Sequence, residues 1–392
     1  MNRYFEIGKE ILNKLNGANY SAYFVGGYIR DRILEIESHD IDITTSATVK
    51  EITSLFDNVK NTGEKYGSVT VIIDEFKFEV TTYRFDGTYL DNRRPEGVVF
   101  TKNLEDDLER RDFTINALCM DSSEKIIDLH NGINDLNNKL IKTINDPLKR
   151  FNEDALRILR AFRFVSKLGF DIEDKTKAGI KSTAHLIKTI SIERVMIELS
   201  KILIAPYRNK ALKLMNELGI LDELYGLKDG LVYLSNSEDE LYAIEAFTLC
   251  FILNDIDDVW RFSNKEIRLI RQLIMITEAT KEADITQLMV YSNGVDACLI
   301  ANKINVTLGR KDQVVLIKKI DSLLPIKDVC DLKFKGQDIL WLTNMQKKSD
   351  IGLIIDDLIF KVINNILPND YEILKKYTLM KIDDLEKDDN NE

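Results

Sequence analysis

The sequence predicts an α+β protein in which a first segment of mixed helices and strands is followed by helices alone. β-type runs with alternating apolar side chains are concentrated before about residue 148. From Asn152 onward, apolar residues recur at helical spacing nearly to the end of the chain. The 392 residues are enough for two or more domains with cores of their own.

Composition narrows the class of protein. A formal net charge of -11 argues against a chain that coats nucleic acid indiscriminately, and it leaves room for a local basic surface. The four cysteines follow no metal or disulfide spacing, which suits a reducing cytoplasm. No signal peptide opens the chain, and no apolar run approaches the roughly 18 residues of a membrane span. We therefore expect a soluble cytoplasmic protein without a membrane partner.

The first elements lead to a glycine pair. A helix is expected over residues 3–16 and a strand over residues 23–25. Gly26 and Gly27 follow and open a short helix, where bare backbone amides suit a phosphate. Arg30 lies about one turn into that helix, so its guanidinium can fork onto the same phosphate.

The next β-type run carries two carboxylates. Asp40 and Asp42 alternate with Ile41 and Ile43, so the aspartates share one face of a strand while the isoleucines point into a core. Adjacent carboxylates repel each other unless a cation is bound, and Mg²⁺ completes such a site with substrate phosphates. An Asp-x-Asp pattern alone also occurs in ordinary strands. The glycines and arginine upstream favour a centre for nucleotidyl transfer.

A helix over residues 48–56 precedes a hairpin of strands at 68–73 and 76–83. In the second strand Glu79 faces away from the core. If this strand pairs beside Asp42, Glu79 becomes a third carboxylate for the metal. Otherwise it is a solvated strand residue.

A second charged cluster follows a helix expected over residues 104–111. Arg110 and Arg111 offer guanidinium groups to a triphosphate, and Asp112 offers a carboxylate to a ribose hydroxyl. The alternative is a surface charge cluster at a helix end.

A third cluster is expected on a helix that contains Glu153. Asp154, Arg157, Arg160 and Arg163 recur every third residue around the side opposite an apolar stripe. As neighbours one turn apart, Asp154 and Arg157 would present an acceptor beside a donor. That arrangement matches the pairing edges of cytosine and adenine and rejects uracil and guanine. The alternative is an intrahelical ion pair worth ~0.2–0.5 kcal/mol.

Together these stretches resemble the class II tRNA nucleotidyltransferases, the bacterial CCA-adding enzymes. The resemblance covers about residues 20–200. It rests on GGYIRD at 26–31 with DID at 40–42, RRDFTINA at 110–117, DLHNGINDL at 128–136, EDALR at 153–157 and SIER at 191–194.

The resemblance implies a polymerase-β-like nucleotidyltransferase head with a mixed sheet, followed by an all-α neck, body and tail. We expect the head over residues 1–148, the neck over 149–205, the body over 206–320 and a tRNA-binding tail over 321–392. The implied reaction is template-independent addition of C, C and A to the 3′ end of tRNA from CTP and ATP, with release of pyrophosphate. By position, Asp40 and Asp42 are catalytic and bind Mg²⁺. The nucleotide-binding residues carried over are Gly27, Arg30, Arg111, Asp112, Asp154, Arg157, Arg160 and Arg163.

Other functions stay open at this point. An A-adding enzyme or a poly(A) polymerase shares the head, whereas CC-adding relatives shorten the loop between the first two motifs. Residues 89–95 (YLDNRRP) are present, which counts against CC-only activity. A catalytically inactive RNA-binding module is opposed by the intact aspartate pair. No His-Asp phosphohydrolase pair follows in the C-terminal half, so we expect no appended phosphatase.

Overall fold

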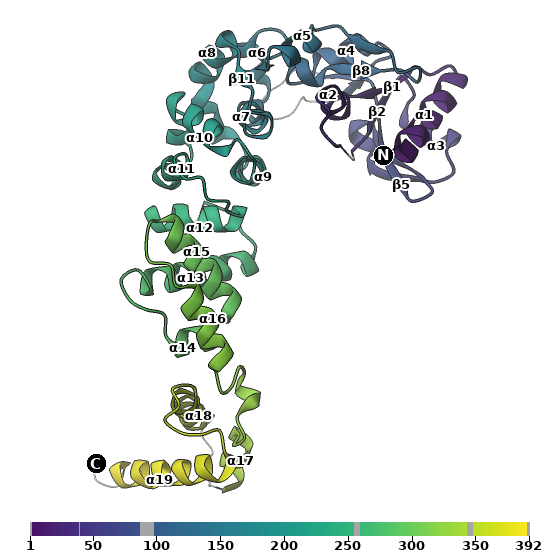
Figure 1. The fold of residues 1–392 in the computed structure, drawn as a ribbon. Coiled ribbons are helices and arrows are strands. Elements are labelled where there is room, and N and C mark those ends of the chain that lie inside the picture. Colours follow the sequence, from purple (N-terminus) through teal and green to yellow (C-terminus); the bar gives the residue numbers. More distant parts are fainter. Residues whose placement is uncertain (1, 39, 87–97, 255–258, 343–347, 390–392) are drawn as a thin grey trace. The chain divides into compact units, whose positions relative to one another are not determined.

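The computed structural model describes residues 2–38, 40–86, 98–254, 259–342 and 348–389. The chain divides into two compact units. The first comprises residues 1–246 and 253–261, and the second comprises residues 247–252 and 262–392. All the described strands lie in the first unit, and the described elements of the second are helical (Figure 1). The predicted order of a mixed segment followed by helices is confirmed, and the loop at residues 89–95 lies outside the described residues.

A seven-stranded mixed sheet forms the centre of the first unit, in the order β3-β4-β5-β2-β1-β8-β9. β2 and β5 run parallel, and the other neighbouring pairs run antiparallel. The predicted hairpin is confirmed as β4 and β5. The strands are β1 (Ala22–Val25), β2 (Asp42–Thr45), β3 (Val59–Gly63), β4 (Ser68–Ile73), β5 (Phe76–Thr82), β8 (Leu118–Met120) and β9 (Ile126–Asp128).

The remaining strands form two small sheets. β6 (Arg84–Asp86) pairs with β7 (Val98–Phe100), and β10 (Leu140–Ile141) pairs in parallel with β11 (Asp171–Ile172). The sequence analysis did not predict β3, whose residues VKNTG lack apolar alternation because this edge strand is largely exposed.

One face of the sheet packs against α1 (Asn2–Gly17). Phe24 of β1 and Phe78 of β5 are fully buried there. Gly8 of α1 allows the close approach, since a Cβ at this position would lie 2.8 Å from the ring of Phe24. Because side chains alternate along a strand, Asp42, Thr44 and Glu79 project from the opposite face.

Some helices of the first unit begin at a side-chain cap. Thr48 and Glu51 form a reciprocal capping box on α3, and Asp146 caps α6 with Pro147 at its first position. Besides α1, these helices are α2 (Gly27–Ile33), α3 (Val49–Leu55), α4 (Leu104–Glu109), α5 (Gly132–Asn137), α6 (Pro147–Glu153), α7 (Leu156–Leu168), α8 (Asp174–Thr183), α9 (Ile192–Leu203), α10 (Arg208–Glu217) and α11 (Lys228–Leu234).

The second unit has its own apolar core, which includes Phe334, Leu358 and Leu374. No helix in the described ranges is long and apolar enough to cross a membrane. α12 (Ala243–Leu253) supplies residues 247–252 to this unit. The other helices are α13 (Asn264–Ala279), α14 (Gln287–Asn293), α15 (Val295–Thr307), α16 (Val314–Leu323), α17 (Gly336–Leu342), α18 (Lys348–Ile363) and α19 (Tyr371–Asp389). The predicted boundaries near residues 148, 205 and 320 stay predictions.

Candidate active site

One pocket in the first unit collects the side chains that the sequence analysis singled out. Its volume is about 470 Å³, within the ~300–1,000 Å³ of sites for small molecules. α2, the start of β2, the segment after α4 and the α6–α7 region all contribute to its lining. The predicted residues that line it are Gly27, Arg30, Asp40, Asp42, Arg111, Asp112, Asp154, Arg157, Arg160 and Arg163.

The two carboxylates lie where β2 begins. Asp42 is its first residue, and Asp40 precedes the strand by two positions. Ile41 and Ile43 are buried, whereas both aspartates are exposed to the pocket. The predicted alternation is confirmed, although Asp40 itself precedes the strand.

Asp42 is partly enclosed and has negative neighbours. Burial by the pocket walls raises the pKa of Asp42 to about 6; Glu79 and Asp40 add to this effect, and Arg111 opposes it. The carboxylate keeps access to solvent, so it can still receive a cation. Glu79 lies opposite Asp42 in the register of β5 and β2, which fulfils the pairing condition under which Glu79 could join the metal site. In the described parts of the chain, no three acidic, histidine or cysteine side chains already form a metal-binding group.

The turn before α2 requires glycine. Gly26 has a φ of +77°, in the left-handed region where other residues are strained. A Cβ at Gly26 would also lie 3.2 Å from Nη1 of Arg111. Glycine therefore lets the backbone entering α2 approach this guanidinium closely.

Arg30 is buried and held on two sides. Its Nε and Nη2 donate to Oδ1 of Asp31 at 2.7 and 2.6 Å, and its Nη1 donates to Oδ1 of Asn116 at 2.6 Å. Lys167 of α7 occupies the other carboxylate oxygen of Asp31 at 2.9 Å. Arg30 is thus positioned by the protein alone.

Asp112 is saturated with donors. Its Oδ1 accepts from the backbone amide of Phe113 at 2.8 Å and from Nδ2 of Asn116 at 3.0 Å. Its Oδ2 accepts from Nε and Nη2 of Arg160 at 2.7 and 2.6 Å. Burial would raise the pKa of Asp112, but Arg160 and these hydrogen bonds outweigh it and hold the pKa at about 2. The four acceptor positions of the carboxylate are filled.

The interpretation of Asp154 and Arg157 as neighbours on one helix is wrong. α6 ends at Glu153, α7 begins at Leu156, and Asp154 between them has an extended backbone. The ion-pair partner of Asp154 is Arg194 of α9, whose Nη2 donates to the carboxylate at 2.9 Å, and the backbone amide of Leu156 donates to its Oδ1 at 3.1 Å. The suggested ion pair between Asp154 and Arg157 is therefore replaced by a longer-range one.

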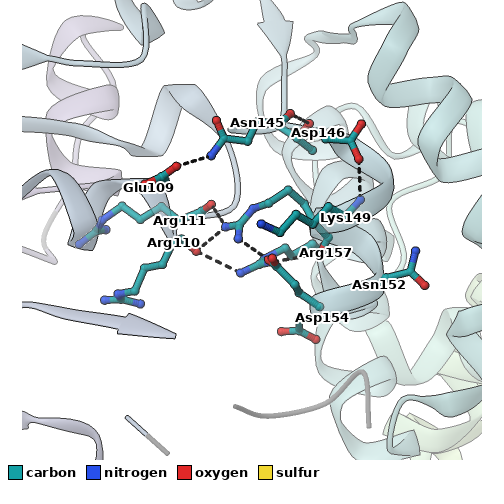
Figure 2. Close-up of polar contacts among 12 residues, drawn as sticks. Glu109, Arg110, Arg111, Asn145, Asp146, Lys149, Asn152, Asp154 and Arg157 are labelled. Atoms are coloured by element: carbon teal, nitrogen blue, oxygen red, sulfur yellow. Dashed lines mark hydrogen bonds and ion pairs between the residues drawn. The ribbon is translucent and has the colours of Figure 1, made fainter. Parts of the chain in front are cut away.

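Arg157 points in another direction, as Figure 2 shows. Its Nη1 donates to the carboxylate of Glu153 and to the carbonyl of Arg150, both at 2.9 Å, and its Nη2 donates to the carbonyl of Arg110 at 3.0 Å. Arg150 donates to that same Arg110 carbonyl at 2.5 Å. Arg157 is thereby joined to the backbone of the Arg110-Arg111 segment.

Three arginines surround one buried ring. The guanidinium carbons of Arg30, Arg160 and Arg163 lie 5.1, 5.7 and 5.9 Å from the centroid of Phe164. Such distances allow cation–π attraction. Glu198 of α9 accepts from Arg163 at 3.4 Å. The protein therefore gathers positive charge on one wall of the pocket, which suits a polyanion.

The sequence analysis assigned no role to several residues that shape this site. Asn116 links Arg30 to Asp112, and its position four residues after Asp112 was the available signal. Lys167 lies seven residues after Arg160, so helical spacing places both on one face of α7. The contact of Asp154 with Arg194 had no local signal, because the two residues are 40 positions apart.

The fold and the site define a nucleotidyltransferase with a polymerase-β-like head. Residues 22–142 match the family model described as poly A polymerase head domain. Residues 169–227 match a model for an RNA- and SrmB-binding site of polymerase A, and residues 237–378 match tRNA nucleotidyltransferase domain 2.

Curated relatives extend the likeness over nearly the whole chain. The CCA-adding enzyme of Streptococcus sanguinis is 34% identical over 385 residues, covering 95% of this chain and 96% of the relative. The CCA-adding enzyme of Limosilactobacillus reuteri is 33% identical over 397 residues, covering 98% of each. The chain belongs to the family of CCA-adding enzymes.

Solved structures of CCA-adding enzymes align with nearly the whole chain. The Bacillus stearothermophilus CCA-adding enzyme in complex with CTP aligns with a TM-score of 0.88 at 28% identity, covering 99% of this chain and 100% of the other. The Thermotoga maritima CCA-adding enzyme complexed with tRNA aligns with a TM-score of 0.67 at 19% identity, covering 97% and 96%, and supports the fold alone.

Proposed function

We propose that this protein adds C, C and A to the 3′ end of tRNA without a nucleic-acid template, using CTP and ATP and releasing pyrophosphate. One observation carries the proposal. A single pocket joins the Asp40/Asp42 pair to an arginine-rich wall and to the Asp154/Arg157 junction. Metal-binding carboxylates, phosphate-binding cations and a base-sized polar edge are the three parts that nucleotidyl transfer from a nucleoside triphosphate requires.

A divalent metal is used by nucleotidyltransferases of this family, and we propose that here it is Mg²⁺. Asp40 and Asp42 would hold it, and Glu79, opposite Asp42 on β5, would add negative charge nearby. The donor set fits, because burial and the neighbouring carboxylates of Glu79 and Asp40 raise the pKa of Asp42, and a hard divalent cation would offset the cost of the charged carboxylate. When bound, two such ions stabilise the attacking and leaving oxygens of a phosphoryl transfer.

The positive wall would receive the triphosphate. Arg30 and Arg111 supply guanidinium groups beside the backbone of Gly27, and Arg163 adds charge from α7. We propose that Asp112 helps to hold the sugar and phosphates mainly through Arg160. Its own acceptor positions are already filled in the described structure.

Asp154 and Arg157 would read the base from the α6–α7 junction. Oδ1 of Asp154 accepts from the backbone amide of Leu156 and from Nη2 of Arg194, whereas Oδ2 accepts from Nη2 of Arg194 alone, so Oδ2 retains a lone pair for an exocyclic amino group. Arg157 is fixed by Glu153 and two backbone carbonyls, which sets the orientation of its guanidinium plane. A carboxylate and a guanidinium held apart by separate partners can present a donor–acceptor pattern that cytosine and adenine share.

The division of the chain into domains is part of the same proposal. We propose a head over residues 1–148, a neck over 149–205 that recognises the base, a body over 206–320 and a tail over 321–392 that binds tRNA. The reaction would take place in the cytoplasm, where tRNA and nucleotides are available.

Single-turnover extension tests the proposed function. Three tRNA substrates would end at the discriminator base, at C and at CC, and each would be offered CTP or ATP alone. We expect C to be added to the first two and A to the third. Extension of the CC-ended tRNA only would identify an A-adding enzyme, and repeated addition of A to all three would identify a poly(A) polymerase.

A further inference from the structure

A fully buried carboxylate lies behind the arginine wall. Asp107 of α4 has an exposed fraction of 0% and is not among the residues that line the pocket. Its Oδ1 accepts from Nε and Nη2 of Arg110 at 2.9 and 2.8 Å. Its Oδ2 accepts from Nη2 of Arg111 at 3.2 Å. One carboxylate therefore holds two adjacent arginines, both of which line the pocket.

The same carboxylate is tied to the strand that carries the metal-type aspartates. Oγ1 of Thr44 donates to Oδ2 of Asp107 at 3.2 Å. Thr44 follows Asp42 by two positions on β2, so both side chains project from one face of the sheet. Asp107 thus sets the position of the two arginines relative to Asp42.

This contact determines which edges of the guanidinium groups face the pocket. Without a shared counter-ion, two neighbouring guanidinium groups repel each other and separate. Asp107 accepts from Nε and Nη2 of Arg110 and from Nη2 of Arg111. Nη1 of Arg111 lies beside Gly26 instead. Nε of Arg111 is buried and has no partner within the described residues. Although burial raises the pKa of Asp107, Arg110 and Arg111 hold that pKa below its usual value, so the carboxylate is charged at neutral pH.

We propose that Asp107 is a positioning residue that holds Arg110 and Arg111 together, with their free N–H groups directed at the triphosphate. The inference rests on the proposed function. It concerns the part of the substrate that CTP and ATP have in common. Loss of Asp107 therefore weakens the binding of CTP and of ATP by the same factor and leaves the choice of base unchanged.

The test compares Asp107→Asn with Asp106→Asn in the full-length chain. Asp106 is the neighbouring residue on α4 and contacts Thr101 and Asn103, so it is a matched control away from the arginines. We would measure KM for CTP and for ATP on suitable tRNA ends, and the Kd of inorganic tripolyphosphate by calorimetry. For Asp107→Asn we expect an increase of about 10- to 100-fold in all three, since hydrogen bonds to charged groups contribute ~1.5–3 kcal/mol. For Asp106→Asn we expect a change of less than about twofold.

Two further variants separate positioning from general loss of structure. Asp107→Glu keeps the charge and should raise the tripolyphosphate Kd less than Asp107→Asn does. In an Arg110→Ala, Arg111→Ala background, Asp107→Asn should raise this Kd by a smaller factor than in the wild type. Equal factors in both backgrounds, or unequal changes for CTP and ATP, would overturn the inference.

The measurements distinguish a wrong proposed function from a wrong positioning role of Asp107. If the wild type and Asp106→Asn transfer no nucleotide to any tRNA end, the proposed function is wrong. If the wild type is active and Asp107→Asn keeps the wild-type tripolyphosphate Kd, only the positioning role is wrong.

Discussion

Two aspartates in one pocket have opposite surroundings. Asp42 has negative neighbours and a pKa of about 6, and no hydrogen bond to its carboxylate contributes to that value. Asp112 accepts hydrogen bonds from Phe113, Asn116 and Arg160, and its pKa is about 2. The same side chain is therefore charge-balanced by the protein at one position and left unbalanced at the other.

The difference indicates how the site is divided. Around Asp112 the protein supplies every partner, so this part of the pocket keeps its geometry before a substrate arrives, and little reorganisation is needed on binding. Around Asp42 the protein supplies burial and two negative neighbours, which Arg111 only partly offsets, and this combination favours the binding of a cation. We interpret the first region as preformed scaffold and the second as the place where chemistry depends on a metal.

Replacing Asp42 by alanine should have the largest effect. We expect turnover to fall by about a thousandfold or more, because metal stabilisation of the transition state contributes several kcal/mol. tRNA binding, measured by filter retention, should fall little. Asp57→Ala, at an exposed position that does not line the pocket, is the control. Equal loss of binding and turnover would mean that the aspartates have a structural role.

Replacing Asp112 by asparagine should destabilise the fold and weaken nucleotide binding by about tenfold. A folded pKa of about 2 lies below the ordinary value, so the ionised carboxylate stabilises the native state by ~2–3 kcal/mol at neutral pH. This contribution is complete above about pH 4 and is lost as the pH falls toward 2. Urea unfolding of both proteins from pH 7 to pH 2.5 measures it. A constant difference in unfolding free energy across this range would contradict the pKa assignment.

Replacing Arg157 by alanine should have the smallest effect on turnover. The other arginines still bind phosphate, so we expect the preference for C and A over U and G to relax by about tenfold before the rate collapses. Lys149→Ala provides a control on α6, because Lys149 does not line the pocket. Misincorporation is measured by offering UTP and GTP singly to tRNA ending at CC. Unchanged selectivity would refute base reading by this residue.

Local sequence patterns predicted the geometry of the Asp40/Asp42 pair well and the surroundings of Asp154 poorly. The alternation of Asp40 and Asp42 with buried isoleucines depends only on the two-residue period of a strand, and it is confirmed. The partner of Asp154 depends on how α9 packs, which no local period encodes. The break between α6 and α7 was missed because the apolar spacing continues across Asp154, even though the backbone there is extended.

The roles of residues that position the side chains of the site were also missed. Asn116 and Asp107 each lie within or beside a recognised motif, but their roles follow from contacts with α2, α4 and β2. Asp107 precedes Arg110 and Arg111 by three and four residues, the spacing of neighbours on a helix, so these ion pairs had a local signal that the sequence analysis did not use. Tertiary packing supplies the further contact of Asp107 with Thr44 of β2, which no local spacing encodes.

Thermal unfolding of two isosteric variants tests the contrast most directly. At pH 7.5 without divalent ions, Asp42→Asn should raise Tm because it removes repulsion, whereas Asp112→Asn should lower Tm because it breaks a satisfied ion pair. Mg²⁺ should stabilise the Asp112 variant and the wild type but should lose most of its effect on the Asp42 variant. A lower Tm for both variants, with equal stabilisation by Mg²⁺, would contradict the division into preformed scaffold and metal-dependent centre.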